Sequence, residues 1–451
     1  MNTPTIGHEE WAVELEARRD WRRDRWGWLQ HQARQAPSAA LVGLPLALAL
    51  ALALLFGNDY ILRVAGTACI YGVLAMGLTL VVGQAGLLDL GYVAYFGVGA
   101  YAYALLASPQ LGLHTPIWLA LPAAIGAAMA AGLLLGVPGL RLNDDYLGIV
   151  TLGFGQVIVL LALKLDRLAL PWAGATLDLT GGPNGILGID PPRLLGWAPA
   201  TQGHWLLVLA ATLLAVLALA SRVVDAPLGQ AWRALREDPL AAAAMGLPVT
   251  RLRLLAVSSG AAIAGLAGAL FAGWQGAIFP VNLDLSLLLT LYAAILIGGL
   301  GSLPGALVGA ALLAALPEIL RDPALGRALV YGGGALALIL WRRWPGAALL
   351  AAGGCGIAIA ASLATQADVT LAGNLALVAL PIVLAALPLV RRPWQRLGLQ
   401  AFTLVLATFA WETRLAAEPG LARPLLLGVA LIAMLIVRPH GLFGRQRVTV
   451  V

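Results

Sequence analysis

The sequence predicts an all-helical membrane protein that crosses the bilayer roughly fourteen times, with some spans broken or re-entrant. Of its 451 residues, 60% are hydrophobic and 11% are charged, whereas about 25% of the residues in soluble domains are charged. The mean hydropathy is +0.87, and the apolar runs are continuous and long enough to cross ~30 Å of hydrocarbon. Transmembrane β-barrels have short segments of alternating polarity instead, so the predicted spans are helices.

The predicted spans follow one another along most of the chain. They are residues 39–56, 61–82, 91–107, 116–137, 147–164, 204–221, 254–273, 285–299, 303–319, 328–341, 347–365, 374–390, 398–411 and 424–437. If the N-terminus lies inside, they place the basic clusters in the cytoplasm and the weakly charged loop 166–203 outside. These clusters are Arg141, the arginines of 222–253, Arg342/Arg343, Arg391/Arg392/Arg396 and Arg438/Arg445/Arg447. The positive-inside rule therefore supports the count and predicts that both termini are cytoplasmic.

Four regions are predicted along the chain. An N-terminal arm at 1–37 precedes a membrane core at 38–341, which contains a polar loop at 222–253. A further membrane region at 342–423 and a final helix with its tail at 424–451 complete the sequence. An excess of Arg, Ala, Gly and Pro is typical of a GC-rich bacterial genome, so we expect the inner membrane of a bacterial cell.

Two segments outside the core leave alternatives open. The arm carries Trp11, Trp21, Trp26 and Trp28 among arginines. It is either a solvated cytoplasmic arm or a helix lying at the membrane interface, with tryptophan at the headgroups and arginine near anionic lipid. Segments 323–346 and 419–441 resemble each other. They are either a local duplication or the convergent result of two spans that end in basic residues.

Several enzyme classes lack their motifs. The only lysine is Lys164, in the sequence Leu-Lys-Leu, so the chain has no P-loop of the form Gly-x-x-x-x-Gly-Lys. The five histidines are scattered without metal-ligand spacing, and no Gly-x-Ser-x-Gly elbow occurs. Cys69 and Cys355 lie inside apolar runs, as small buried side chains do. We therefore expect no catalytic site and no metal site, and the net charge of +6 suits cytoplasmic loops rather than a nucleic-acid partner.

A glycine-rich break between two spans is the first candidate for a solute pathway. Its residues are Gly83, Gln84, Gly86, Asp89 and Gly91. Irregular backbone at membrane depth is tolerated only where protein or a water-filled cavity covers it, and the freed helix ends offer N–H and C=O groups to a polar solute. Asp89 either binds an ammonium group there or caps the next helix after a tight turn.

Three further clusters of polar or glycine residues indicate local structure more than a binding role. Thr151, Gly153 and Gln156 lie inside a span, where polar side chains meet another helix or a lumen. The glycines of 298–305 permit close helix packing. Outside the membrane, an ordered loop is predicted from residues that favour turns. These residues are Thr180, Gly181, Gly182, Pro183 and Asn184.

The loop 222–253 contains a short capped helix by its sequence. Ala241–Met245 favours helix, Asp238 with the proline after it marks a start, and Gly246 marks a stop. A cytoplasmic partner that binds such a helix can move the two spans that it connects. The alternative is a plain loop that carries positive charge on the inner side.

Taken in order, these motifs resemble the permease subunit of bacterial ABC importers for branched-chain amino acids, the LivM type. The matching stretches are 77–91, 145–155, 180–186, 232–246, 298–302 and 438–444. The resemblance implies a solute path without a nucleotide site of its own. It also implies a second homologous permease, two P-loop ATPase subunits that use ATP, and a periplasmic solute-binding protein. The remaining partners are a small polar solute and membrane lipid, with no nucleic acid.

The resemblance also assigns the coupling of the permease to its ATPase to one group of residues. They are Trp232, Arg233, Arg236, Glu237, Asp238, Ala243 and Gly246. The family usually has Glu where Ala243 stands and often Glu where Gln156 stands, so one contact and one carboxylate are missing. The chain after 340 is longer than the family pattern, and we have no functional account of 342–423.

Two alternatives stay open at this point. The same family includes permeases for urea, short amides or other amino acids. A different class, the ion-coupled secondary transporter, needs ionisable groups within the membrane. Asp89, Asp284, Glu318 and Glu412 are the candidates, and each falls near a predicted end of a span.

Overall fold

The computed structural model describes residues 57–319 with gaps at 140–143, 167, 171–174 and 193–197, together with 441–443 and a few isolated positions. The chain divides into two compact units, residues 1–314 with 438–451, and residues 315–437. Almost all described residues belong to the first unit. The predicted arm at 1–37 and the region at 342–423 lie outside the described residues, as do the two similar segments at 323–346 and 419–441.

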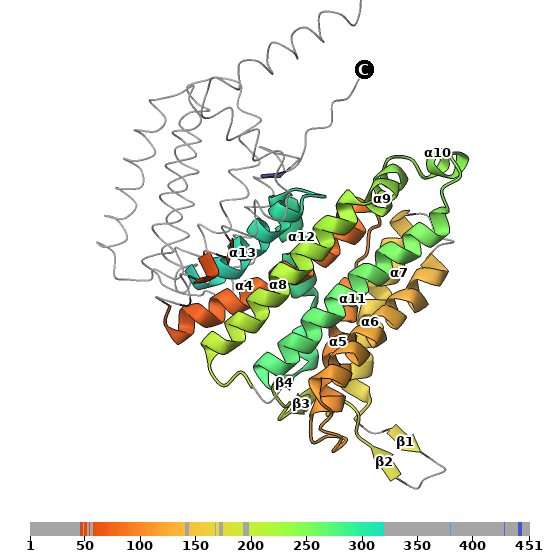
Figure 1. Ribbon diagram of the computed structural model, residues 1–451. Helices are drawn as coiled ribbons and strands as arrows, with labels where there is room; N and C mark the ends of the chain where they lie inside the picture. The colour runs from red at the N-terminus through yellow and green to blue at the C-terminus, as the bar shows by residue number, and fades with distance from the viewer. Residues whose placement is uncertain are drawn as a thin grey trace, which may run out of the picture. The chain divides into compact units, whose positions relative to one another are not determined.

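Long apolar helices occupy every predicted span that the structure describes in full (Figure 1). They are α4 (Asp59–Leu78), α5 (Tyr92–Ala107), α6 (Ile117–Gly139), α7 (Asp144–Lys164), α8 (Gln202–Asp225), α11 (Val249–Gln275), α12 (Leu285–Gly298) and α13 (Leu303–Ile319). Among the described residues, six apolar helical segments are long enough to cross a membrane, whereas α5 and α13 are shorter. The predicted spans at 39–56 and after 319 fall outside the part described in full.

The core of the first unit is the packing of α5 against α11 and α6, which lie side by side (Figure 1). Glycines bring the backbones together: a Cβ on Gly99 would overlap the backbone of Gly265, and one on Gly268 would overlap the Phe96 carbonyl. Gly265 in turn lies against Ala128 of α6. Small residues at helix contacts allow this close approach, which gains dispersion energy where lipid supplies no hydrophobic driving force.

The helices differ greatly in how much of their surface the chain covers. In the most apolar part of each span, 72% of the residues are buried for the span that begins at α4, against 33% for α6 and 22% for α7. On α7, the side chains of Ile149 and Leu160 are exposed. Much of α6 and α7 is therefore free to meet lipid or another subunit.

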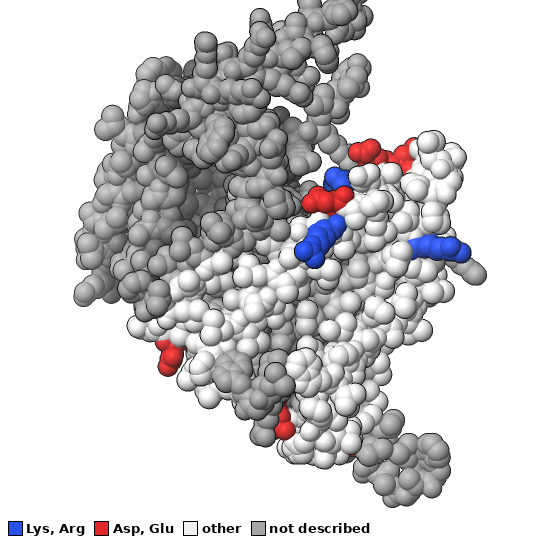
Figure 2. Space-filling view, viewed as in Figure 1, with Lys and Arg blue, Asp and Glu red and all other residues white. Residues whose placement is uncertain are grey.

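The loops gather at two ends of the helices. One end holds α9 (Pro227–Glu237) and α10 (Pro239–Ala244), and we call it the α9 end. At the opposite strand end, β1 (Leu168–Leu170) pairs with β2 (Ala175–Leu177), and β3 (Ile186–Leu187) pairs with β4 (Ala277–Ile278), both antiparallel (Figure 1). The all-helical prediction missed these two short pairs. On the face seen in Figure 2, charged side chains lie toward the ends, and the surface between them is uncharged.

Two of the apolar segments depart from regular α-helical geometry. The last turn of the first span is a π-helix, η1 (Thr79–Gln84), and residues 85–91 are not helical before α5 begins. α12 has only 14 residues and follows a 3₁₀ turn, η3 (Pro280–Leu283). The break predicted at 83–91 corresponds to η1 and the non-helical residues after it, whereas no break was predicted at η3. π-Helical turns and broken helices are frequent at functional sites.

The loop between α12 and α13 is a meeting point for other backbone segments. Gly298 packs against Gly305, so the two helices approach closely there, as predicted for the glycine cluster. Near the end of the chain, Leu442 N–H donates to the Ile297 carbonyl over 2.9 Å and Phe443 N–H donates to the Gly298 carbonyl over 2.9 Å. The stretch 441–443 is therefore fixed to the end of α12.

Candidate functional site

The two glycine clusters of the sequence meet at the α9 end. A Cβ on Gly83, in η1, would lie 2.7 Å from the Gly301 amide nitrogen, so only glycine lets the two backbones approach this closely. Gln84 Nε2 donates to the Gly301 carbonyl over 2.7 Å, and the Gln84 side chain is buried. The break after the first span is thus closed by the α12–α13 loop, 217 residues further along the chain.

Asp89 is buried in the non-helical stretch and does not cap α5. Its Oδ1 accepts from the Gly91 N–H over 3.0 Å, and Gly91 itself is the residue that precedes the helix, without a side-chain cap. The interpretation of Asp89 as an N-cap was therefore wrong, because the carboxylate turns back on its own loop. Asp89 Oδ2 has no hydrogen-bond partner among the described residues, although the Tyr95 hydroxyl neighbours the carboxylate. The Tyr292 hydroxyl donates to the Asp89 carbonyl over 2.7 Å.

Thr151 of α7 holds the same stretch from the other side. Its Oγ1 accepts from the Leu90 N–H over 2.9 Å and donates to the Gly148 carbonyl over 3.0 Å. The sequence left open whether Thr151 contacts another part of the protein or a lumen, and the structure shows that it contacts a neighbouring segment. Gly153 is exposed, with open space where a Cβ would point, and Gln156 is also exposed. One face of α7 therefore supports the break, and its other face is uncovered.

The loop 222–253 folds as two helices, α9 and α10, separated at Asp238. The short helix predicted from Asp238 to Gly246 is α10, and α9 before it was not predicted as a separate helix. Asp238 adopts an extended conformation (φ −154°, ψ 106°) between the two and caps α10. Trp232 is fully buried, and its Nε1 donates to the Leu252 carbonyl over 2.9 Å. Trp232 thus anchors α9 to the start of α11 and presents no surface to a partner.

Arg236 connects α9 to the broken span. Its guanidinium donates to the Gly83 carbonyl, and a Cβ on Gly86 would lie 2.7 Å from Arg236 Cγ. A Cβ on Gly301 would lie 3.1 Å from the same guanidinium. Arg233, one turn away on α9, donates to the carbonyls of Val224 and Gly229 instead. Arg236 is therefore the point where the loop helix, the break and the α12–α13 loop meet.

The exposed tip of this loop is apolar. Leu240 is 83% exposed and Met245 is 84% exposed, at the two ends of α10. Glu237, Ala243 and Gly246 are also exposed. Sequence reasoning did not single out Leu240 or Met245, although two large apolar residues in a polar loop were the signal available. Exposed apolar side chains on a short ordered helix are typical of a docking surface.

α10 depends on its cap. Asp238 Oδ1 accepts from the Leu240 N–H over 2.8 Å and from the Ala241 N–H over 3.1 Å, and Gly246 ends the helix with a positive φ of 82°. Both the predicted start and the predicted stop are confirmed. A helix of six residues is marginal alone, so its cap matters.

We expect Asp238→Ala to destabilise α10 by about 1 kcal/mol, whereas Asp238→Asn keeps an acceptor and is nearly neutral. Hydrogen exchange of the amides of 240–245 in the purified protein is the measurement. Faster exchange in the alanine variant alone is expected. Equal exchange in both variants would contradict the role of the cap.

The predicted outer loop lies at the strand end. Gly181, Gly182 and Gly185 have positive φ values of 67°, 55° and 65°, as the turn chemistry required. Asp178 Oδ1 accepts from the Gly181 N–H over 2.7 Å. Thr180 is buried, whereas the side chains of Pro183 and Asn184 are exposed. The loop therefore presents an ordered tip beside the β3–β4 pair.

No group of three His, Cys, Asp or Glu side chains that suits a metal ion occurs among the described residues. The chemistry of the site is instead hydrogen bonding at broken helices and packing at an exposed loop helix.

Comparison with known proteins decides the family. The family model described as the permease component of branched-chain amino acid transport systems matches residues 60–329, more than half of the chain. The chain belongs to this permease family. Its match covers the break, the loop 222–253 and the outer loop.

The permease has close relatives among curated proteins. It is 39% identical over 302 residues to the high-affinity branched-chain amino acid transport permease LivM of Salmonella typhimurium, covering 62% of this chain and 68% of that protein. LivM of Escherichia coli is 38% identical over the same length with the same coverage. A probable LivM of Methanocaldococcus jannaschii is 26% identical over 196 residues, 41% of this chain and 53% of that protein. No solved structure matches the permease significantly.

Family membership makes the permease a multi-pass membrane protein and a transport subunit, not an enzyme. The family resemblance found in the sequence is thus confirmed. The matched region ends at 329, so the permease carries about a quarter of its chain beyond the family pattern, as the sequence indicated.

Proposed function

We propose that this permease is one of two homologous membrane subunits of an ATP-driven importer for branched-chain amino acids. Two separate P-loop ATPase subunits use the ATP, and a periplasmic solute-binding protein delivers the solute. The observation that carries the proposal is the bond between Arg236 on the loop helix and the Gly83 carbonyl at the broken span. This bond connects the loop helices, whose exposed tip suits a protein partner, to the broken span, whose free backbone groups suit a polar solute.

The charge distribution orients the permease. Arg222, Arg233, Arg236, Arg251 and Arg253 lie on the segments at the α9 end. Among the described residues, fewer basic side chains lie toward the strand end. By the positive-inside rule the α9 end faces the cytoplasm, and the β3–β4 pair with the loop 180–185 faces the periplasm. Both termini are then cytoplasmic, in a bacterial inner membrane, and the whole chain has about fourteen spans.

Coupling runs from α10 through α9 to the break. When ATP closes the ATPase subunits, the exposed tip of α10 moves with them, and Trp232 keeps α9 and the start of α11 moving together. Arg236 passes the motion to η1, whose backbone is locked against Gly301. If α9, α10 and η1 move together between two arrangements, ATP binding at the ATPase end favours one of them, and the solute pathway then opens to one side of the membrane at a time.

The solute pathway follows the uncovered side of the break. Gln84 and Asp89 close the cytoplasmic end by their backbone and side-chain bonds. Gly153 and Gln156 lie on the exposed face of α7, where a second permease completes the pore. The tip formed by Pro183 and Asn184 receives the binding protein.

The test is purification of the tagged permease from its native membrane with mass spectrometry of its partners, followed by transport in proteoliposomes. A second permease, two P-loop ATPases and uptake that requires ATP are the expected results. A permease that is purified alone and moves solute without ATP would instead be an ion-coupled secondary transporter.

Docking through the apolar tip is tested by Leu240→Glu. A buried carboxylate without a partner is strongly unfavourable at an interface, so we expect the ATPase to dissociate during purification, with at least a ten-fold loss of bound ATPase. Gln230→Glu is the matched control, because it adds the same charge at an exposed position on α9. Retention of the ATPase by the Leu240 variant would exclude this tip as the docking surface.

A further inference from the structure

We propose that the pocket between α5, α7 and the start of α12 is a binding subsite for an aliphatic amino acid in transit. Asp284 takes the ammonium group, the amide of Gln156 takes the carboxylate, and the leucine-rich wall takes the side chain. This inference rests on the proposed function, since it places the pathway along this face of the permease.

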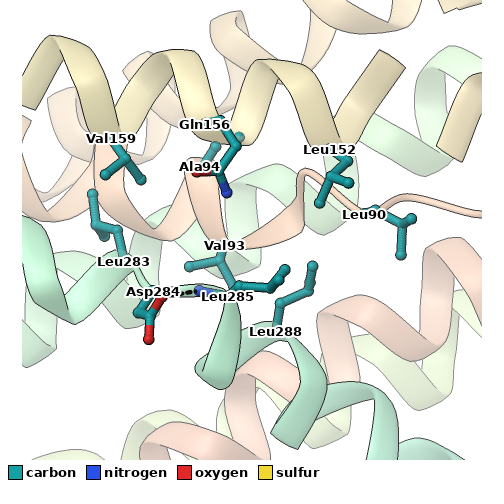
Figure 3. Close-up of a pocket in the computed structure, with 11 residues that line it drawn as sticks. Leu90, Val93, Ala94, Leu152, Gln156, Val159, Leu283, Asp284, Leu285 and Leu288 are labelled. Carbon is teal, nitrogen blue, oxygen red and sulfur yellow. Dashed lines mark hydrogen bonds between the residues drawn. The ribbon is translucent and has the colours of Figure 1, made fainter. Parts of the chain in front are cut away.

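The pocket is a half-open groove: its empty space, counted together with the solvent at its mouth, is about 290 Å³. Its enclosed part has room for about one water molecule, so a bound amino acid would also occupy the open mouth. Its wall is almost entirely aliphatic, and Figure 3 shows these side chains between Gln156 on α7 and Asp284 before α12. The aliphatic lining includes Leu90, Val93, Leu152, Val159, Leu285 and Leu288. Gln156 and Asp284 are the polar side chains among the lining residues.

Both polar groups lie at membrane depth. Leu283 packs on Gly97 of α5 so closely that a Cβ there would lie 2.7 Å from the leucine methyl carbons. At ~1.5 Å per residue, Gly97 is roughly 7 Å from the start of α5 and about 15 Å from its end. Asp284 follows Leu283 directly, so α12 begins inside the bilayer. Gln156 is about 18 Å from the start of α7 and about 12 Å from its end.

An exposed carboxylate at this depth requires water or protein in front of it. Asp284 Oδ1 accepts from the Leu285 N–H over 2.7 Å, and Oδ2 accepts from the Ser286 hydroxyl over 3.0 Å, yet the side chain stays exposed. Facing lipid, such a group is expensive, and ionisable residues within membrane spans mark substrate or ion paths. The face that carries Gln156 and Asp284 therefore lines the pathway.

The composition of the pocket selects the class of solute. A hard cation needs six or more oxygen ligands, and the pocket offers the oxygens of two side chains. A sugar or another polyhydroxylated solute would leave hydroxyl groups facing leucine, which is costly. A zwitterion with one aliphatic side chain matches one carboxylate, one amide and an apolar wall.

The first test is leucine uptake by the reconstituted importer with Asp284→Asn. Asparagine keeps the cap of α12 and removes the charge, so we expect uptake to fall about ten-fold or more. ATP hydrolysis stimulated by the binding protein should stay within about two-fold of the wild type, since α9 and α10 are untouched. Asp59→Asn, at an exposed position in the first turn of α4, is the matched control and should transport normally.

The possible outcomes separate this inference from the proposed function. Normal uptake by Asp284→Asn overturns the subsite and leaves the importer standing, and so does an equal fall of uptake and ATP hydrolysis. Wild-type uptake that does not need ATP overturns the importer itself. Val159→Phe narrows the aliphatic wall and should lower the ratio of leucine to valine uptake several-fold, whereas an unchanged ratio overturns the assignment of that wall.

A second measurement does not depend on how well the Asp284 variant folds. Val159→Cys, which keeps both polar groups of the pocket, is made in a background without Cys69 and Cys355 and is labelled with methanethiosulfonate ethylammonium in the intact importer. We expect labelling from water and several-fold slower labelling during turnover with the leucine-loaded binding protein. Leu134→Cys on α6, a position 70% exposed in the chain, faces lipid and should stay unlabelled. Labelling of Val159→Cys that leucine does not slow overturns the subsite.

Discussion

Arg236→Ala should leave the permease folded in the membrane while ATP-driven uptake falls by at least about ten-fold. The guanidinium makes a charge-assisted bond to the Gly83 carbonyl, and such bonds are the strong ones in a partly buried site. Without it, α9 still docks through α10, but its motion no longer reaches η1. The measurement is ATP hydrolysis and leucine uptake on the same proteoliposomes, and we expect hydrolysis to continue without matching transport.

Two further variants sharpen this result. Arg251→Gln removes the same charge at an exposed position on the first turn of α11 and should transport normally. Arg236→Lys keeps the charge but loses the planar fork, so we expect an intermediate uptake. If Arg236→Ala transports as well as Arg251→Gln at equal abundance, motion reaches the break by another route.

Gly99→Leu should remove most folded permease from the membrane. A Cβ at position 99 already overlaps the backbone of Gly265, so a larger side chain has to separate α5 from α11. Overpacking costs about 1–3 kcal/mol even where side chains can adjust, and here the obstacle is backbone. The measurement is the yield of monodisperse protein after detergent extraction, together with its unfolding temperature.

The control for this variant lies on the next helix. Gly126→Leu in α6 points into open space, with nothing within 4 Å of the new Cβ, and leucine is well suited to a lipid-facing position. Its yield should equal or exceed that of the wild type. Equal yields for Gly99→Leu and Gly126→Leu would mean that the α5–α11 contact is not what holds the unit together.

Features that depend on neighbouring residues were predicted from the sequence. The apolar runs gave the helices, because length and hydropathy are properties of one segment. Asp238 and Gly246 gave the limits of α10 for the same reason: a cap acts within one turn. The two short strand pairs were missed because a strand such as Ile186–Leu187 is too short to show any alternation.

Contacts between distant segments escaped prediction. Arg236 and Gly83 are 153 residues apart, and an arginine in a basic loop has no local feature that distinguishes a bond to the backbone from simple exposure. Arg233 looks the same in the sequence, yet it stays on its own segment. Asp284 was placed at the edge of the predicted span 285–299, which matches the start of α12, but hydropathy does not give the depth of that helix end in the membrane. Its depth follows from the packing of Leu283 on Gly97.

The acceptor of the Arg236 bond has a genetic consequence. Since it is a main-chain carbonyl, every possible residue at position 83 still carries it, and no change of side chain at that position removes the acceptor. Mutations can therefore change the strength of this bond by changing the arginine or by moving the backbone of η1, but not by removing the acceptor group. Suppressors of an Arg236 defect should arise in the segments that set the position of that backbone, the α12–α13 loop above all, because a Cβ at position 83 would lie only 2.7 Å from the Gly301 amide nitrogen.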